Sequence, residues 1–314
     1  MNESSVLDGA LDSLLGTADE FGGGLSNHGP MVVESLLHLG HADAVAPWLA
    51  NYSPQLEPLT TLQPPPVAAA DLAAVLEELL PGSVGAATHG LLRTAHALRG
   101  LATHGTSPQR WRELERGINY WRLSAEPLPA IAPCGSLDHA DAISEVPRTP
   151  PSGVFFISNR LREVDLAALT PHLQAARAFI DPDDGLRTVA LTALQTLVAN
   201  PGRFIAFVHA VTSTAMTRYV VAAVGDHVAA DAPARQWTIL GALWSAYGEH
   251  APVELSSVAE STAPSWSQLS ERAIANGDEH VIKLISATAD IAAMATTDYD
   301  RTTRALLGSL AVFA

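Results

Sequence analysis

The stretch FIAFVHAVTSTAMTRYVVAAV, residues Phe204 to Val224, decides the fold and is the most apolar part of the chain. Its length would suit a membrane span, but His209 and Arg218 lie inside it, and ionisable residues are costly in a bilayer. A helix that is apolar on nearly every side is otherwise typical of a protein core. We therefore expect a buried helix at the centre of a helical fold, and no membrane partner.

The segments on both sides of this stretch repeat their apolar residues at the helical period. Gly277 followed by Asp278 is typical of one helix ending and the next beginning. Prolines interrupt the pattern between about residues 125 and 158, where 154–157 is the one strand candidate. The sequence predicts one all-α domain over residues 1–314, with a long Pro-rich irregular loop at about 125–158. We expect helices at Pro30–Leu39, Asp71–Pro81, Val84–His104, Pro108–Leu123, Asp165–Phe179, Gly185–Ala199, Arg203–Val224, Pro233–Tyr247, Ser265–Asn276 and Asp278–Met294, with a final helix toward the C-terminus.

Composition and charge narrow the classes of function. Hydrophobic residues make up 47% of the chain and charged residues 16%, and the net charge is −15 at pH 7. Nucleic-acid binding needs a basic surface, so we expect no nucleic-acid partner. Cys134 is the only cysteine, and the acidic start of the chain lacks the basic region of a signal peptide. These features predict a cytoplasmic protein.

The use of lysine is unusual. Of the 18 basic residues, Lys283 is the only lysine. Lysine at one position of such an arginine-rich chain indicates a need for an amine, because an amine can lose its proton and a guanidinium cannot. The alternative is a surface lysine that pairs with Glu279, where an arginine would serve equally well.

Histidines are abundant, with 12 in the chain. His89 and His96 are two helical turns apart on one face, and His280 and Lys283, three residues apart, also share a face. His280 falls in the first turn of its expected helix, where the helix dipole disfavours a charged imidazole. Neutral imidazoles bind Fe, Cu, Ni and Zn, and a lysine carboxylated by CO2 would add an anionic oxygen ligand. For His209, a hydrogen-bonded core histidine is the alternative to a metal ligand.

Familiar nucleotide-binding and di-iron motifs are absent from the sequence. Residues Gly22–Gly24 do not follow a strand and do not complete a dinucleotide-binding fingerprint, and no P-loop is present. No Glu-x-x-His pair occurs, which removes the signature of the di-iron bundles. The sequence thus favours a site built from histidines.

Four segments, in this order, resemble the questin oxidase-like family of aromatic polyketide oxygenases. They are Asn27–Met31 (NHGPM), His89–His96 (HGLLRTAH), Phe207–Thr212 (FVHAVT) and Gly277–Lys283 (GDEHVIK). Members of this family oxidise anthraquinone-type polycycles with O2, and one branch holds a mononuclear non-haem iron with four histidines and a carboxylated lysine. The resemblance implies the iron ligands His28, His89, His209, His280 and Lys283. Arg93 stands where fungal members tend to carry a further histidine, and we take the catalytic candidates to be Lys283, His96 and Arg93.

The leading interpretation is a non-haem Fe(2+) oxygenase that uses O2 to cleave a ring of a polycyclic aromatic polyketide, or to insert oxygen into it. One alternative is a Baeyer–Villiger-type oxidase with NADPH as co-substrate, and another is a non-catalytic all-α ligand-binding protein. We expect the 125–158 loop to cover the substrate pocket. Aromatic candidates for the pocket wall are Trp48, Tyr52, Tyr120, Trp121, Trp244 and Tyr247. The sequence carries no signal for an oligomeric state.

Overall fold

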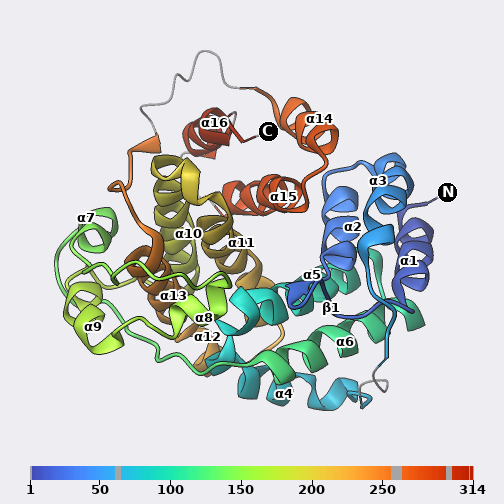
Figure 1. The fold of residues 1–314 in the computed structure, drawn as a ribbon, viewed down its shortest axis with the longest axis horizontal. Helices are drawn as coiled ribbons and strands as arrows, with labels where there is room; N and C mark the ends of the chain where they lie inside the picture. Colours follow the sequence, from blue (N-terminus) through green and yellow to red (C-terminus); the bar gives the residue numbers. More distant parts are fainter. Residues whose placement is uncertain (1, 61–64, 256–263, 295–298, 311, 314) are drawn as a thin grey trace.

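The computed structural model describes residues 2–60, 65–255, 264–294, 299–310 and 312–313, and within them the fold is all-α, as predicted. A small antiparallel hairpin joins β1 (Glu20–Phe21) to β2 (Leu25–Ser26). The α-helices are α1 (Glu3–Leu14), α2 (Gly29–His38), α3 (Val45–Tyr52), α4 (Leu72–Leu79), α5 (His89–His104), α6 (Pro108–Ser124), α7 (His139–Ser144), α8 (Ile157–Leu161), α9 (Leu166–Gln174), α10 (Pro182–Ala199), α11 (Phe204–Val221), α12 (Asp226–Ala229), α13 (Ala232–Tyr247), α14 (Trp266–Asn276), α15 (Glu279–Ala293) and α16 (Tyr299–Leu310) (Figure 1).

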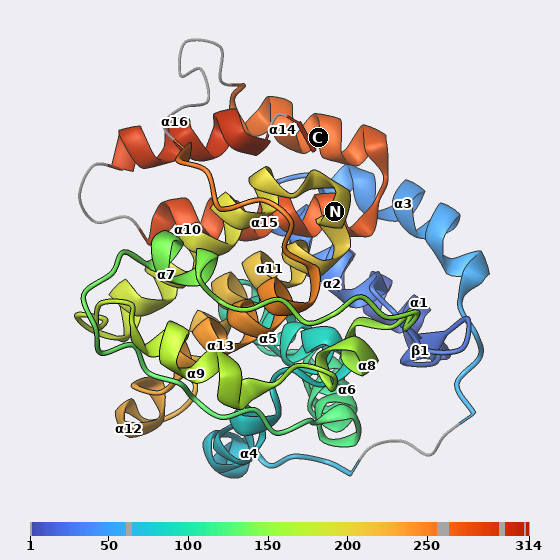
Figure 2. The ribbon, with the colours of Figure 1, turned by 60° about the vertical axis from the view of Figure 1, so that its left-hand side comes forward.

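Helices α2, α5, α11 and α15 form the centre of the molecule. α2 packs against α5, α5 against α11, α11 against α15, and α15 against α2, so the four helices close a ring around a shared interior. α1, α3 and α6 flank the ring on the side of α2 and α5, and α10 and α13 flank it on the side of α11. α14 and α16 cover α15 (Figure 2).

Helix α11 is the buried central helix that the apolar stretch predicts. With the turn before it, Pro201–Val221 is the one described segment long and apolar enough to cross a membrane, and 72% of its most apolar window is buried inside the protein. Its surface packs on α5, α10, α13 and α15. The predicted boundary between α14 and α15, at Gly277 and Asp278, is also confirmed. Gly277 has a φ of 80° at the end of α14, and the Asp278 side chain accepts hydrogen bonds from the first backbone amides of α15.

The start of α5 differs from the prediction, because the helix begins at His89 and not at Val84. Ala86, Ala87 and Thr88 have φ values of 46°, 53° and 70°, in the left-handed region that is costly for residues other than glycine. The preceding Gly85 lies against the end of α6, where a Cβ atom would meet the Ser124 carbonyl oxygen at 1.8 Å. The left-handed turn therefore separates α5 from the segment before it and carries the Ala86 carbonyl to the side of His89.

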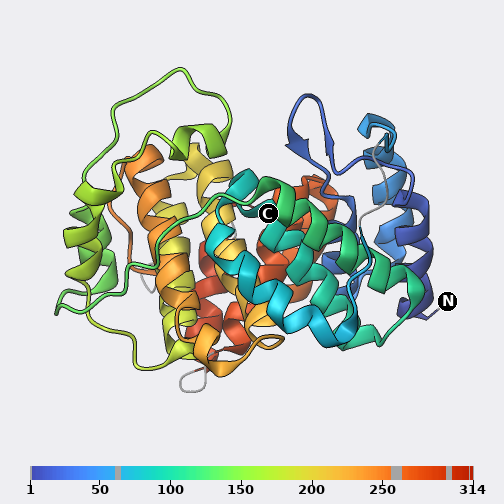
Figure 3. The same ribbon diagram turned by 90° about the horizontal axis from the view of Figure 1, so that it is seen from below.

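The predicted irregular loop at 125–158 is confirmed in outline, with the short helix α7 inside it. The strand candidate at 154–157 is wrong, because residues 154–156 pair with no other strand and α8 begins at Ile157. Phe155 of this segment is 82% exposed and lies near the end of the loop, so its side chain is not part of the core. This loop and the β1–β2 hairpin, which the sequence did not predict, project from the same side of the molecule (Figure 3).

Candidate metal centre

Each helix of the central ring brings one histidine to the same point. His28 is the residue before α2, His89 is the first residue of α5, and His280 is the second residue of α15. His209 lies in the second turn of α11. His28, His89 and His209 are buried, and the side chain of His280 is 12% exposed. The structure therefore brings together all four of the predicted histidine ligands.

The four imidazole rings lie within contact distance of their neighbours. His28 Nε2 is 2.7 Å from His89 Nε2, and His89 Nε2 is 3.2 Å from His209 Nε2. The ring centroid of His280 lies 4.7 Å from that of His28 and 5.4 Å from that of His209. One nitrogen from each of His28, His89 and His280 falls within 4.8 Å of the other two. Donor atoms this close are able to share one ion.

Hydrogen bonds behind two of the rings fix the position of their protons. His89 Nδ1 donates to the Ala86 carbonyl oxygen at 2.6 Å, and His209 Nδ1 donates to the Ile205 carbonyl oxygen. Because a carbonyl only accepts, both neutral rings carry a lone pair on Nε2, and these lone pairs face each other across 3.2 Å. Such a contact is repulsive by itself, and a cation beside both atoms would relieve it. Two nitrogens that bind one metal at ~2.1 Å lie about 3.0–3.4 Å apart at angles of roughly 90–110°, so these residues fit a transition metal.

Lys283 lies one turn after His280 on α15 and is 1% exposed. Its amine makes no hydrogen bond or ion pair with any residue that the structure describes, which is rare for a buried lysine. Burial lowers the pKa of Lys283 to about 8, although the nearby carboxylates of Glu279 and Asp278 raise it. The charge of this amine acts on all four imidazoles, so it lies near them, and it has no hydrogen-bond acceptor among the described residues. We name the set His28, His89, His209, His280 and Lys283 the ligand layer.

The histidines of the ligand layer are neutral at pH 7. Burial lowers the pKa of His28, His89 and His209 well below its usual value, and the charge of Lys283 lowers it further. Burial lowers the pKa of His280 as well. The positive ends of α2, α5 and α15 begin at these residues and act in the same direction. Neutral imidazole is the form that binds a metal.

A cavity of about 740 Å³ lies directly beside the ligand layer. The four histidines line it together with aromatic side chains from several elements, namely Phe21, Phe155, Phe156, Phe204 and Tyr247. Residues Phe155–Asn159 at the end of the long loop and the start of α8 form one wall, and the β1–β2 hairpin forms another. The prediction that the loop covers the pocket thus holds for its last residues. Its earlier part, including α7, packs on α9 and α10.

Of the aromatic residues predicted for the pocket, only Tyr247 is among the described residues of its wall. Trp48 and Tyr52 stack on each other behind the ligand layer instead. The Tyr52 hydroxyl accepts a hydrogen bond from the backbone amide of His28 at 2.7 Å, and Trp48 Nε1 donates to the Gly277 carbonyl at 3.0 Å. Helix α3 is therefore bonded to the start of α2, which follows His28, and to the turn before α15, which carries His280 and Lys283. Trp121 and Trp244 are buried in the core, and Tyr120 lies beside the hairpin.

His96, a predicted catalytic residue, lies in a second polar layer about two turns further along the same helices. Arg99 is its centre and bonds Glu34 Oε1 at 2.7 Å and Asp290 Oδ2 at 2.6 Å. His96 Nδ1 lies 2.7 Å from Glu34 Oε2. Burial alone would raise the pKa of Glu34, but Arg99 and His96 outweigh it and lower this pKa to about 2. We name the set Glu34, His96, Arg99, Tyr219, Ser286 and Asp290 the ionic layer, because all of its members are joined by hydrogen bonds or ion pairs.

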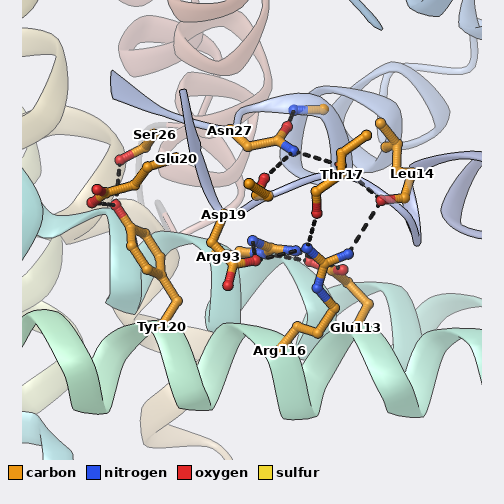
Figure 4. A network of polar contacts seen from close by, with 12 residues as sticks. Leu14, Thr17, Asp19, Glu20, Ser26, Asn27, Arg93, Glu113, Arg116 and Tyr120 are labelled. Atoms are coloured by element: carbon orange, nitrogen blue, oxygen red, sulfur yellow. Dashed lines mark hydrogen bonds and ion pairs between the residues drawn. The ribbon is translucent and has the colours of Figure 1, made fainter. Parts of the chain in front are cut away.

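Arg93, the other catalytic candidate on α5, also lies outside the ligand layer. Its guanidinium forms two bonds to Glu113, at 2.5 and 3.0 Å, and one to Asp19 at 2.6 Å (Figure 4). Neither Arg93 nor His96 is among the described residues that line the cavity. The structure therefore brings five of the predicted site residues together and places these two in neighbouring buried networks. A catalytic role for either stays a prediction.

No protein-family model matches the chain, and no curated protein matches it. The resemblance to the questin oxidase-like family therefore stays a prediction, and the geometry of the site carries the functional argument.

Proposed function

We propose that this protein is a non-haem iron oxygenase that acts with O2 on a flat polycyclic aromatic substrate. The observation that carries the proposal is the pair of facing lone pairs on His89 Nε2 and His209 Nε2, 3.2 Å apart and buried beneath a large cavity. A core histidine kept for packing would have hydrogen-bond partners for its polar atoms. His28 Nδ1 is instead buried without a described partner, and a cation beside His89 Nε2 and His209 Nε2 would relieve the contact between them; both observations support a metal site over a purely structural role.

The residues of the ligand layer would hold the iron, which would supply redox chemistry with O2 at the floor of the cavity. The chain itself does the rest. The carbonyls of Ala86 and Ile205 hold the rings of His89 and His209 with Nε2 toward the shared point. The phenyl rings around the cavity offer faces on which a flat ring system can stack. A volume of about 740 Å³ suits a ligand of several fused rings.

The alternative with NADPH as co-substrate finds less support in the cavity. A dinucleotide carries phosphates, which proteins usually hold with basic side chains or glycine-rich helix starts. Arg203 is the one Lys or Arg among the described residues of the wall, and it pairs with Glu249 at 2.6 Å.

Anaerobic reconstitution tests the proposal. The protein is loaded with Fe(2+), its metal content is measured, and O2 consumption is followed with a panel of anthraquinones and their hydroquinones. We expect about one iron per chain and O2 uptake that depends on both iron and the aromatic compound. Matched loading with Zn(2+) is the control, which should fill the site without O2 uptake. A protein that binds no metal would support the non-catalytic alternative.

A further inference from the structure

The charged side chains on the cavity wall are unevenly balanced. Among the described residues of the wall, the charged ones are Glu20, Arg203 and Glu279. Arg203 is about half exposed and is neutralised by Glu249, which lies outside the wall. Two carboxylates therefore remain at the cavity, the exposed Glu20 of the hairpin and the partly exposed Glu279 at the start of α15.

Glu279 accepts no hydrogen bond from any residue that the structure describes. Its nearest polar neighbours are His28 Nδ1 at 3.6 Å and His280 Nδ1 at 3.8 Å, beyond hydrogen-bond distance. His28 Nδ1 is itself buried without a partner, and the His28 side chain is only 5% exposed. Glu279 is 28% exposed, so of these atoms only His28 Nδ1 is buried without a partner; buried polar atoms normally find partners, and the carboxylate beside it offers a second contact, so together they point to a bound polar group.

Glu20 is oriented by a hydrogen bond from α6. Its Oε1 accepts a hydrogen bond from the Tyr120 hydroxyl at 2.9 Å, and that hydroxyl lies 2.6 Å from Ser26 Oγ (Figure 4). One oxygen of the carboxylate is thus bonded to Tyr120. A carboxylate has two oxygens and about four acceptor positions, so this contact leaves capacity for a ligand.

We infer that Glu279 and Glu20 select the substrate by accepting hydrogen bonds from its hydroxyl groups, so that the cavity takes a neutral polyphenol and rejects anionic aromatics. This inference rests on the proposed function, because it specifies the aromatic substrate of the same site. Hydrogen bonds from a hydroxyl to an ionised carboxylate are among the stronger ones. A carboxylate on the ligand would instead be repelled by the two carboxylates of the wall. The aromatic side chains of the wall provide contact area for the ring system, and the two carboxylates determine which ring substituents are accepted.

Ligand binding to the metal-free protein tests the inference without any turnover. The probes are a dihydroxyanthraquinone, its dimethyl ether and an anthraquinone carboxylate, titrated at pH 7 by calorimetry. We expect the dihydroxy compound to bind about tenfold more tightly than the ether, and the carboxylate to bind most weakly. E279Q and E20Q should each weaken binding of the dihydroxy compound by about tenfold and leave the ether unchanged. E78Q, which removes an exposed carboxylate of α4 outside the cavity wall, is the matched control and should change neither.

The possible failures are distinguishable. Equal binding of the dihydroxy compound and its ether to the unaltered protein would overturn the inference, and this comparison needs no variant to fold. Loss of binding in E78Q as large as in E279Q would overturn it as well. In both cases an aromatic ligand still binds, and the proposed function stands. If none of the three compounds binds, the aromatic substrate of the proposed function fails together with the inference.

Discussion

The ligand layer and the ionic layer lie on the same four helices and are both buried, yet they differ in how their polar groups are satisfied. In the ionic layer, Arg99 joins the carboxylates of Glu34 and Asp290 with nitrogen–oxygen distances of 2.5–2.7 Å. In the ligand layer, four imidazoles and the Lys283 amine face one another, and no described carboxylate lies within 3.5 Å of them. The charged groups of the ionic layer are all paired, and His96 Nε2 is its one described polar atom that is buried without a partner, whereas the Lys283 amine of the ligand layer has no described counter-charge within ion-pair distance.

This difference separates two roles for buried polar residues. A network whose charges are all paired contributes to a defined helix packing, and it is damaged when any one partner is removed. An incomplete one makes the folded chain less stable than it would be with apolar side chains, because desolvated groups lack partners. We therefore expect substitutions in the ligand layer to affect metal binding, and substitutions in the ionic layer to affect folding.

The largest effect is expected for Lys283→Arg, which should prevent metal binding. The amine is buried beside four neutral imidazoles without an acceptor, so a carboxylated lysine would supply the anionic oxygen that the layer lacks. A guanidinium cannot take up CO2 and would place a fixed positive charge next to the ion. Iron content after reconstitution should fall from about one per chain to below one-tenth.

Two further variants define what the lysine does. Lys283→Glu, which offers an anionic oxygen on a shorter stem, should recover part of the metal content. Lys283→Met, similar in length and uncharged, should recover none. A fully metal-loaded Lys283→Arg protein would show that the residue is not a ligand.

His209→Ala should remove the metal while leaving the protein folded. The substitution eliminates the lone-pair contact with His89 Nε2, so the loss of packing around a buried ring is partly offset. Iron content and the thermal midpoint with and without Fe(2+) are the measurements. The unaltered protein should be stabilised by added Fe(2+), and the variant should not. Full iron content in the variant would remove His209 from the site.

Arg99→Leu in the ionic layer should destabilise the fold by about 3–5 kcal/mol, because it leaves two buried carboxylates without their partner. Urea unfolding measures this change. Arg203→Leu is the control, since its pair with Glu249 is about half exposed and should contribute at most ~1 kcal/mol. If the two substitutions cost the same, the ionic layer is not a cooperative network.

The sequence predicted the ligand layer better than the surrounding cavity, for physical reasons. Two features of the sequence indicated the ligand layer: His280 and Lys283 share one helix face, and Lys283 is the single lysine in the chain. Neither feature depends on how the helices pack. The β1–β2 hairpin has two residues in each strand, too short for a pattern, and its position over the histidines depends on distant packing. His28 carries no periodic signal, because it precedes its helix and was found only through the resemblance.

The two catalytic candidates on α5 show the limit of arguments from a shared helix face. His96 shares a face with His89, but seven residues correspond to a rise of about 10 Å along a helix. It therefore meets Glu34 of α2 and not the other imidazoles. Arg93 likewise meets Glu113 of α6, a partner that no local spacing indicates.

Acid should destabilise the metal-free protein mainly through the ligand layer. Folding lowers the pKa of its buried histidines below about 6.5, so the unfolded chain takes up protons that the folded chain does not. Stability is therefore full above pH 6.5 and falls below it, by up to about 1.4 kcal/mol per pH unit for each such histidine. Urea unfolding between pH 7.5 and 5 measures the slope, and His209→Phe should reduce it. A flat profile would contradict neutral buried imidazoles.

The smallest effect separates the two layers through one tyrosine hydroxyl in each. The Tyr52 hydroxyl accepts from the His28 amide at 2.7 Å, and the Tyr219 hydroxyl donates to Asp290 Oδ1 at 2.7 Å. Tyr52→Phe and Tyr219→Phe should each cost about 1–2 kcal/mol of stability, because each leaves a buried partner with one bond fewer.

Only Tyr52→Phe should also weaken metal binding, by several-fold, because the lost bond holds the backbone of a ligand. Metal affinity measured by competition with a chelator, beside urea unfolding of both variants, gives the two readouts. Equal weakening of metal binding by both substitutions would mean that the layers are mechanically coupled. In that case a change in the ionic layer reaches the metal through the helices that the two layers share, and their separation into a folding network and a binding site would be wrong.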